Sequence, residues 1–166
     1  GAGAYAAGDL AAEEFPDLEP ALSATVSVAR RLQDPLSEFT KVDPRVVGVG
    51  LYQHDVDRER LKEHLDAVVG SCANRVGVDV NKAHAALLRN VAGFDPTLAR
   101  EILAHRRRNG PFRSREQVKE VPGLDSHAFR NCAGFLRVYD GENPLDRTGI
   151  HPESYAHAER LIEFFG

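Results

Sequence analysis

The clearest candidates for a chemical role are arginines near the middle of the chain. Arg106, Arg107 and Arg108 are consecutive, and Arg113 and Arg115 follow within a few positions. Guanidinium groups bind phosphate oxygens through charge and paired hydrogen bonds, so these side chains would hold a nucleic-acid backbone if they converged. Cations in the last turn of a helix also stabilise the helix dipole, and a solvated helix end is therefore an equal alternative.

The charge is unevenly distributed along the 166 residues, which carry a formal net charge of −4. Between Lys82 and Arg137 we count eleven basic and five acidic residues, a local charge of +6. The remainder holds ten basic and twenty acidic residues, a charge of −10. The local excess of positive charge is compatible with nucleic-acid binding, although the average composition would not indicate it.

The basic segment contains an internal repeat with an offset of 30 residues. Residues 91–96 align with residues 121–126, with valine, glycine and aspartate identical at equivalent positions, and Arg100 aligns with Arg130. Each copy predicts two helices joined by a sharp turn, at 83–91 and 95–108 in the first copy and at 115–121 and 125–136 in the second. Two such copies should pack as a pseudo-dimer, because each buries the apolar face of the other.

Each turn contains a glycine, Gly93 or Gly123, that permits the positive φ of a tight helix–helix bend. The helix that follows begins with unpaired N–H groups and the positive end of its dipole, which together attract phosphate. A plain helical hairpin would use glycine in the same way. Two copies at a fixed offset inside the basic segment favour the phosphate-binding interpretation.

Several elements must position this repeat. Residues 21–33 predict a helix with Leu22 and Leu32 on its apolar face, and shorter and longer helices should follow at 36–42 and 57–76. The glycine-punctuated segment 46–52 predicts a turn or a short extended piece and lacks the spacing of a phosphate loop. After the repeat, a polar turn at 140–144 and a helix from about Pro152 end in the apolar run 161–165, which needs a partner surface.

The long helix predicted at 57–76 has a single apolar stripe that places Cys72 in the core. Cys72 and Cys132 are 60 positions apart with no CxxC or Cys/His cluster, so we expect reduced thiols, with no disulfide and no zinc site. His54, Asp55 and His64 could suggest a metal or catalytic pair. No third ligand stands at a suitable spacing, and Gln53, His54 and Asp55 are interpreted as turn and capping groups.

The remaining patterns exclude several classes of function. No run of apolar residues is long enough to span a membrane, and no secretory leader is present, so a cytoplasmic protein is expected. No catalytic triad, nucleophile elbow or carboxylate cluster indicates an enzyme. The chain contains no methionine, and we interpret it as a piece of a longer protein.

Longer motifs carry a family resemblance. The segments Val-Ala-Gly-Phe-Asp-Pro from Val91, Arg-Asn-Gly-Pro-Phe from Arg108 and Val-Pro-Gly-Leu-Asp from Val121 resemble tandem helix-hairpin-helix domains. Together with segments 28–36, 47–56 and 143–155, they resemble the Tex family of bacterial transcription accessory proteins. The resemblance extends from about residue 9 to the end of the chain.

This resemblance implies an all-α fold, with a helical connector followed by a tandem helix-hairpin-helix domain similar to domain 2 of RuvA. We expect a connector, disordered in part, at residues 1–20, a helical linker after a YqgF domain at 21–80, the tandem hairpins at 81–138, and the start of a further helical segment at 139–166. Tex-like proteins also carry an RNase H-like YqgF domain before this region and an OB-fold RNA-binding domain after it.

The resemblance also exposes one departure. Hairpins of this family usually read Gly-hydrophobic-Gly, and Asp95 and Asp125 replace the second glycine. Aspartate is a good helix N-cap, so it should occupy the amides that a phosphate would use and repel the phosphate. We therefore expect weaker hairpin binding, with more of the affinity supplied by arginines.

The predicted function is a non-catalytic, largely sequence-independent module that binds DNA or RNA as a monomer, without cofactor, metal or membrane. Transcription machinery is a further expected partner. The expected binding residues are Gly93, Arg100, Arg106, Arg107, Arg108, Arg113, Arg115, Gly123 and Arg130. The alternative is a scaffold that orients the flanking YqgF and OB-fold domains without binding nucleic acid.

Overall fold

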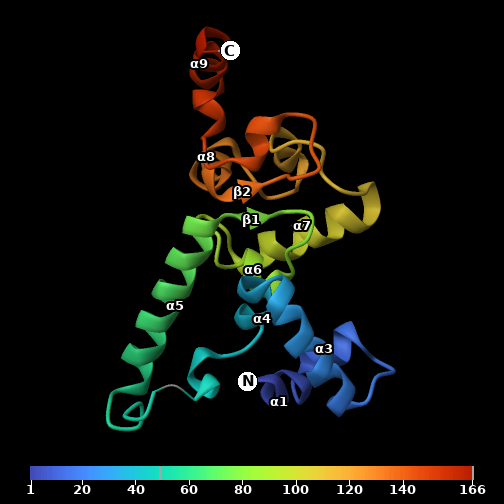
Figure 1. Cartoon of the computed structure of the whole chain (residues 1–166), viewed down its shortest axis with the longest axis vertical. Helices are drawn as coiled ribbons and strands as arrows, with labels where there is room; N and C mark the ends of the chain where they lie inside the picture. Colours follow the sequence, from blue (N-terminus) through green and yellow to red (C-terminus); the bar gives the residue numbers. More distant parts are fainter. Residues whose placement is uncertain (49, 166) are drawn as a thin grey trace. The chain divides into compact units, whose positions relative to one another are not determined.

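The computed structural model describes residues 1–48 and 50–165, in two compact units that divide between residues 69 and 70 (Figure 1). Helices dominate both units. Within the described residues the only strands are β1 (Val78–Asp79) and β2 (Leu136–Arg137). The all-α prediction is confirmed. No helix in the described part of the chain is long and apolar enough to cross a bilayer.

The first unit begins with two short helices, in a segment where the sequence indicated only a connector. Its elements are α1 (Ala2–Ala6), α2 (Asp9–Glu14), α3 (Pro20–Gln33), α4 (Pro35–Thr40) and the 3-10 helix η1 (Pro44–Val47). Pro20 and Pro35 stand in the first turns of α3 and α4, where a missing N–H costs nothing. The turn predicted at 46–52 includes Val49, which lies outside the described residues.

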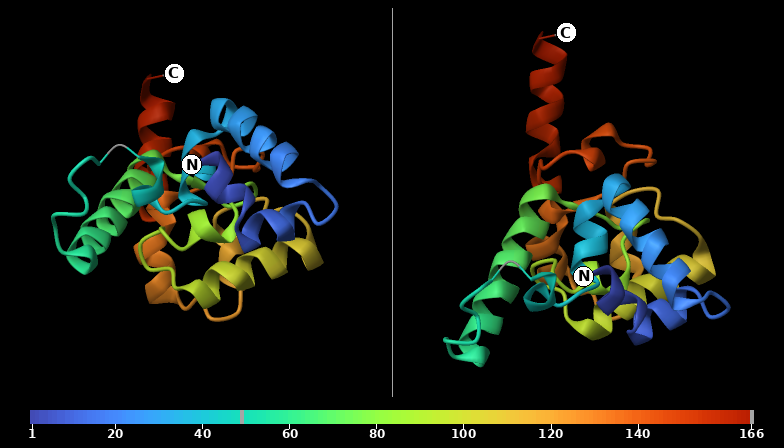
Figure 2. Two further views of the ribbon diagram at one scale, coloured as in Figure 1. Left: turned by 90° about the horizontal axis from the view of Figure 1, so that it is seen from below. Right: turned by 60° about the horizontal axis from the view of Figure 1, so that its bottom comes forward.

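Helix α3 packs through a small polar face, so the predicted apolar contact face is wrong. Ser23 and Ser27 are buried, whereas Leu22 is 52% exposed and Leu32 is 91% exposed. The Ser27 hydroxyl donates to Glu38 Oε2 of α4 at 3.0 Å. Because serine is small, α1 and α4 can both pack against α3 (Figure 2).

An ion-pair network fastens α1, α2 and α4 in this unit. Lys41 Nζ lies 2.6 Å from Glu38 Oε1 and 2.9 Å from Glu14 Oε1. The Tyr5 hydroxyl donates to Glu14 Oε2 at 2.7 Å. The Lys41 and Glu38 side chains are nearly inaccessible to water, and each charge has an opposite charge beside it, as burial requires.

Helix α5 (Arg58–Val76) begins as predicted, with Asp57 Oδ1 accepting a hydrogen bond from the Arg60 amide at 2.9 Å. Its burial does not follow the predicted stripe. Cys72 is exposed, so its placement in the core is wrong, and Ala73 is the fully buried residue of this helix. The residue that packs is therefore a small one beside the stripe, which lets α5 approach its neighbours closely.

The second unit contains the repeat and the segment that follows it. Its elements after α5 are β1, α6 (Ala85–Leu88), α7 (Pro96–Asn109), η2 (Glu116–Glu120), α8 (Ser126–Cys132), η3 (Ala133–Phe135), β2, η4 (Pro144–Arg147), η5 (Pro152–Ser154) and α9 (Tyr155–Phe165). Gly110 ends α7 with a φ of 85°. The apolar residues Leu161, Ile162, Phe164 and Phe165 of α9 are exposed.

The core of the second unit draws on both copies of the repeat. Its fully buried residues include Val80, Leu88, Ile102, Val118 and Leu136. Strands β1 and β2 pair in parallel, with Val78 opposite Leu136 and Asp79 opposite Arg137. The residues that enter and leave the repeat are therefore hydrogen-bonded to each other.

Candidate nucleic-acid interface

The two hairpin turns have the same backbone geometry. Gly93 has a φ of 85° and Gly123 a φ of 89°, the left-handed region that a side chain would disfavour. The Phe94 amide donates to the Val91 carbonyl at 3.0 Å, and the Leu124 amide to the Val121 carbonyl at 3.2 Å. The repeat and its glycine turns, predicted from the 30-residue offset, are confirmed.

Both capping aspartates are engaged as predicted. Asp95 Oδ1 accepts from the Leu98 amide at 2.6 Å, and Asp125 Oδ1 accepts from the Ala128 amide at 2.7 Å. The hydrogen bond from Ala128 lowers the pKa of Asp125, so the carboxylate is charged at neutral pH. An anion already holds one helix-start amide in each copy, and Pro96 has none to offer. The amides alone therefore make a poor phosphate site.

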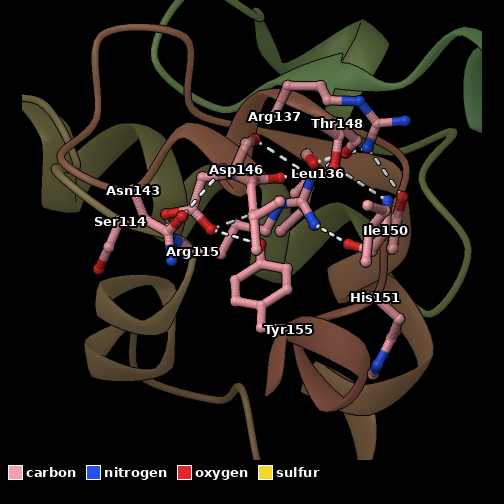
Figure 3. Close-up of polar contacts among 12 residues, drawn as sticks. Ser114, Arg115, Leu136, Arg137, Asn143, Asp146, Thr148, Ile150, His151 and Tyr155 are labelled. Carbon is pink, nitrogen blue, oxygen red and sulfur yellow. Dashed lines mark hydrogen bonds and ion pairs between the residues drawn. The ribbon is translucent and has the colours of Figure 1, made fainter. Parts of the chain in front are cut away.

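Arg115 does not reach the surface, so its predicted phosphate contact is wrong. The residue is 0% exposed. Its guanidinium donates to the carbonyls of Ile150 at 2.6 Å and Asp146 at 3.1 Å, and to that of Thr148 (Figure 3). The Asp146 carboxylate accepts from the Arg115 amide at 3.1 Å and from the Tyr155 hydroxyl at 2.6 Å. Burial lowers the pKa of Arg115, and its role is to fasten the segment after the repeat.

Arg106 is also engaged inside the unit. Its Nη1 donates to the Val80 carbonyl at 2.9 Å and to the Ala83 carbonyl at 2.6 Å. Burial lowers the pKa of this half-buried guanidinium. Arg106 therefore joins the end of α7 to the segment after β1, and it contributes less to a phosphate surface than its sequence position suggested.

Arg107, Arg108 and Arg113 are exposed, but they do not stand beside the first glycine turn. Arg108 follows Asp95 by 13 residues in the same helix, which separates the two ends by about 20 Å at 1.5 Å per residue. Arg108 Nη2 also lies 3.9 Å from Glu101 Oε2. The predicted arginine ridge and the first hairpin turn are therefore two separate sites along α7.

A different set of basic residues flanks the turns. Arg100 and Arg130 stand one helical turn into α7 and α8, and both are exposed. Arg100 Nη2 lies 3.5 Å from Thr97 Oγ1, so its side chain points back toward the start of α7. Arg89 and Lys119, on the element before each turn, are exposed and share the 30-residue offset. Neither residue is among those expected from the sequence, although the 30-residue alignment pairs them.

The surroundings of the two turns differ. Asn74 of α5 clamps the first turn, because its Oδ1 accepts from the Ala92 amide at 3.0 Å and its Nδ2 donates to the Asn90 carbonyl at 3.3 Å. A Cβ added to Gly93 would lie 3.5 Å from Asn131 Cβ of α8. A Cβ added to Gly123 would meet no atom within 4 Å. Gly93 thus lies against α8, whereas Gly123 has no such neighbour, and both glycines are exposed to solvent.

The histidines singled out in the sequence take structural positions. His64 Nδ1 lies 2.7 Å from the Arg60 carbonyl, one turn earlier in α5. His54 is exposed, in a turn closed by a hydrogen bond from the Asp55 amide to the Tyr52 carbonyl at 3.0 Å. In the part of the chain that the structure describes, no group of three or more His, Cys, Asp or Glu residues could hold a metal ion.

Three family models match the chain. A helix-hairpin-helix motif matches residues 73–137, the Tex protein YqgF-like domain matches residues 1–33, and an HHH domain matches residues 143–166. Protein tex of Bordetella pertussis is 52% identical over 162 residues, which cover 98% of this chain and 20% of that protein. The chain belongs to the Tex family.

Further Tex relatives show the same coverage. The transcriptional accessory protein Tex of Neisseria gonorrhoeae is 51% identical over 162 residues, or 98% of this chain and 21% of that protein. The human S1 RNA-binding domain-containing protein 1 is 37% identical over an alignment of 214 residues, covering all of this chain and 22% of that protein. The chain thus spans about a fifth of the length of these curated Tex relatives.

Proposed function

We propose that the tandem hairpins, residues 81–138, bind nucleic-acid backbones without catalysing a reaction and with little preference for sequence. The observation that carries this proposal is the repeated set of four exposed cations around two glycine turns of equal geometry, Arg89, Arg100, Lys119 and Arg130. Their positions follow the 30-residue repeat, so the two copies offer the same two-cation arrangement twice. The helix-hairpin-helix match over residues 73–137 supports the same conclusion.

The arrangement favours phosphate contacts over base contacts. Long, exposed arginine and lysine side chains follow a backbone through charge, and such contacts carry no sequence information directly. Arg107, Arg108 and Arg113 lie outside this set and add attraction at longer range, which salt screens. The module would therefore bind DNA and RNA duplexes or strands in a strongly salt-dependent way, as a monomer.

A salt titration tests the proposal. Affinity for a short duplex should fall linearly on a logarithmic salt scale, with a slope of roughly −0.9 for each phosphate neutralised. The double variant Arg100→Glu/Arg130→Glu should weaken binding at low salt by at least about tenfold and make the slope shallower by about two phosphates. The matched control, Arg107→Glu/Arg108→Glu, changes the same net charge away from the turns and should have a smaller effect.

A scaffold remains the second candidate, because two structural observations favour it. The guanidinium groups of Arg106 and Arg115 donate hydrogen bonds to backbone carbonyls inside the unit. Asp95 and Asp125 place negative charge at both helix starts. Absence of binding at low salt, in a folded chain, would leave this scaffold role as the function.

The link to transcription is also part of the proposal. One relative is named a transcriptional accessory protein and another an S1 RNA-binding domain-containing protein. We infer that the longer Tex proteins combine this module with their other domains at transcribed nucleic acid. Co-purification of this chain with a transcription complex, lost in Arg100→Glu/Arg130→Glu, is the corresponding test.

A further inference from the structure

The second hairpin borders a cavity of about 320 Å³ within the second unit. Glu116 and Lys119 line it from η2, Ser126, Phe129 and Arg130 from α8, and His151 to Glu153 from the start of η5. Lys119 and Arg130 are the cations that flank the second glycine turn. The cavity therefore opens beside the proposed backbone-binding residues.

The first copy of the repeat has different residues at the corresponding positions. The counterparts of Glu116, Ser126 and Phe129 are Ala86, Pro96 and Ala99. The sequence thus replaces two small apolar residues and a proline by a carboxylate, an aromatic ring and a hydroxyl. The outer wall, His151 to Glu153, comes from beyond the repeat. This chemistry is particular to the second copy.

Inside the cavity, Lys119 Nζ lies 4.5 Å from the centre of the Phe129 ring and pairs with the Glu116 carboxylate. An ammonium over a ring face is held weakly when it is exposed, and Lys119 is exposed. Phe129 itself is only 3% exposed, so its ring face becomes available to a flat ligand only when the Lys119 ammonium moves aside. The lysine would then be available to an adjacent phosphate.

The outer wall is held in place by its own hydrogen bonds. His151 Nδ1 accepts from the Glu153 amide at 3.2 Å, so the proton of the neutral ring lies on Nε2, which donates to the Arg130 carbonyl at 2.9 Å. Lys119 and Arg130 balance Glu116 and Glu153 in charge. This lining offers little to a free anion, but it offers acceptors, a hydroxyl and a ring to a neutral, hydrogen-bonding, planar group.

We propose that this cavity binds one unpaired nucleotide, with its base against Phe129 and its phosphate between Lys119 and Arg130. The proposal rests on the proposed backbone binding and adds a preference within it. Glu116, Glu153 and Ser126 are suited to the amino and ring groups of a base edge. Aromatic stacking accepts every base, so the preference is for an unpaired nucleotide and not for a sequence.

The test compares three DNA probes: a blunt duplex, the same duplex with one unpaired 3′ nucleotide, and the same overhang without its base. The chain should bind the base-bearing overhang about tenfold more tightly than the blunt duplex, by the usual contribution of one stacked base. The abasic overhang should bind like the blunt duplex. Equal affinity for the abasic and base-bearing overhangs would assign the gain to phosphate and overturn the proposal.

Variants separate the cavity from the fold. Phe129→Leu keeps an apolar side chain and should remove the overhang preference, so that the base-bearing and abasic overhangs bind with equal affinity. Ser126→Pro restores the residue of the first copy at a helix position that suits proline, and it should reduce the preference about fivefold through the lost hydrogen bond. Arg107→Gln, away from the cavity, should weaken binding to all probes alike.

The outcomes for the two proposals are distinct. Salt-dependent binding with equal affinity for all three probes would overturn the cavity proposal and leave backbone binding intact. No binding to any probe at low salt, with the chain folded, would overturn both. A full overhang preference retained in a folded Phe129→Leu chain would show that the base stacks elsewhere.

Discussion

The first and second hairpins share a turn, a capping aspartate and flanking cations, and they differ in the contacts around the turn. The first turn is clamped by Asn74 and leads into the 14-residue helix α7. The second follows a 3-10 helix, leads into the seven-residue helix α8, and is open around Gly123. The same repeated sequence pattern therefore produces the same turn geometry in two different environments.

The difference shows how a repeat can divide its roles. The first copy is anchored through its turn, and its long helix carries Arg106 back to the carbonyls of the β1 segment. The second copy is anchored through Arg115, whose guanidinium contacts carbonyls of the segment after the repeat. Its turn and flanking cations therefore stay accessible. The partners that anchor each copy, Asn74 and Asp146, lie outside the aligned positions.

The largest effect should come from removing the anchor of the second copy. Arg115→Met leaves the carbonyls of residues 146, 148 and 150 without their donor and the Asp146 carboxylate without its counter-ion at 3.9 Å, and it should lower the free energy of unfolding by about 3–5 kcal/mol. Urea unfolding measures this. The matched control, Arg113→Met, changes an exposed arginine two residues away and should stay within about 0.5 kcal/mol of the parent chain.

The two turns should be destabilised to the same extent when their glycines are replaced. Gly93→Ala and Gly123→Ala each force a side chain into left-handed backbone, at a cost of about 1–2 kcal/mol in unfolding free energy. Asparagine tolerates this region, so the corresponding asparagine variants should lose less. A tolerated alanine at Gly123 beside a damaging one at Gly93 would show that the open turn relaxes, and the shared geometry would then not be obligatory.

The clamp on the first turn should matter to that copy alone. Asn74→Ala removes two hydrogen bonds to the loop that precedes Gly93 and should cost about 1–2 kcal/mol. Amide hydrogen exchange should speed up at residues 90–94 and stay unchanged at 121–125. Faster exchange at both turns would mean that the copies open together, contrary to separate anchoring.

The smallest effect should come from replacing Asp125, the capping aspartate of the second turn. The hydrogen bond from Ala128 lowers the pKa of Asp125 from its ordinary 3.8, so its ionised form contributes stability well above that pH. The contribution is lost as the pH falls through the lower folded-state value. Asp125→Asn keeps a cap without charge, so its stability should depend less on pH below about 4, and its affinity for duplex should rise by about two- to threefold. An unchanged affinity would show that phosphate passes away from this turn.

Much of the local structure could be predicted because it depends on residues that are close together in the sequence. A repeated glycine specifies the left-handed turn, Asp95 and Asp125 specify helix starts, and Gly110 specifies a helix end. Just before η2, Ser114 Oγ accepts from the Gln117 amide at 3.3 Å, and Gln117 Oε1 accepts from the Arg113 amide at 2.6 Å, which is a pairing between near neighbours of the same kind.

The sequence could not show which groups the long side chains would contact. Arg115 resembles its exposed neighbours in sequence, but its acceptors are carbonyls 31 to 35 residues later in the chain. The burial of Ser27 and the exposure of Cys72 likewise depend on which neighbour packs closely. Periodicity identifies a helix, whereas the side that packs is decided by partners distant in sequence.

The pairing of β1 with β2 has a topological consequence. Because Val78 lies opposite Leu136, the polypeptide enters and departs from the tandem hairpins at neighbouring points. Such a loop resembles an inserted domain, and the contacts of Asn74 and Asp146 fasten it further to the segments on either side. A pull on the flanking segments would therefore act on this strand pair and on those contacts together.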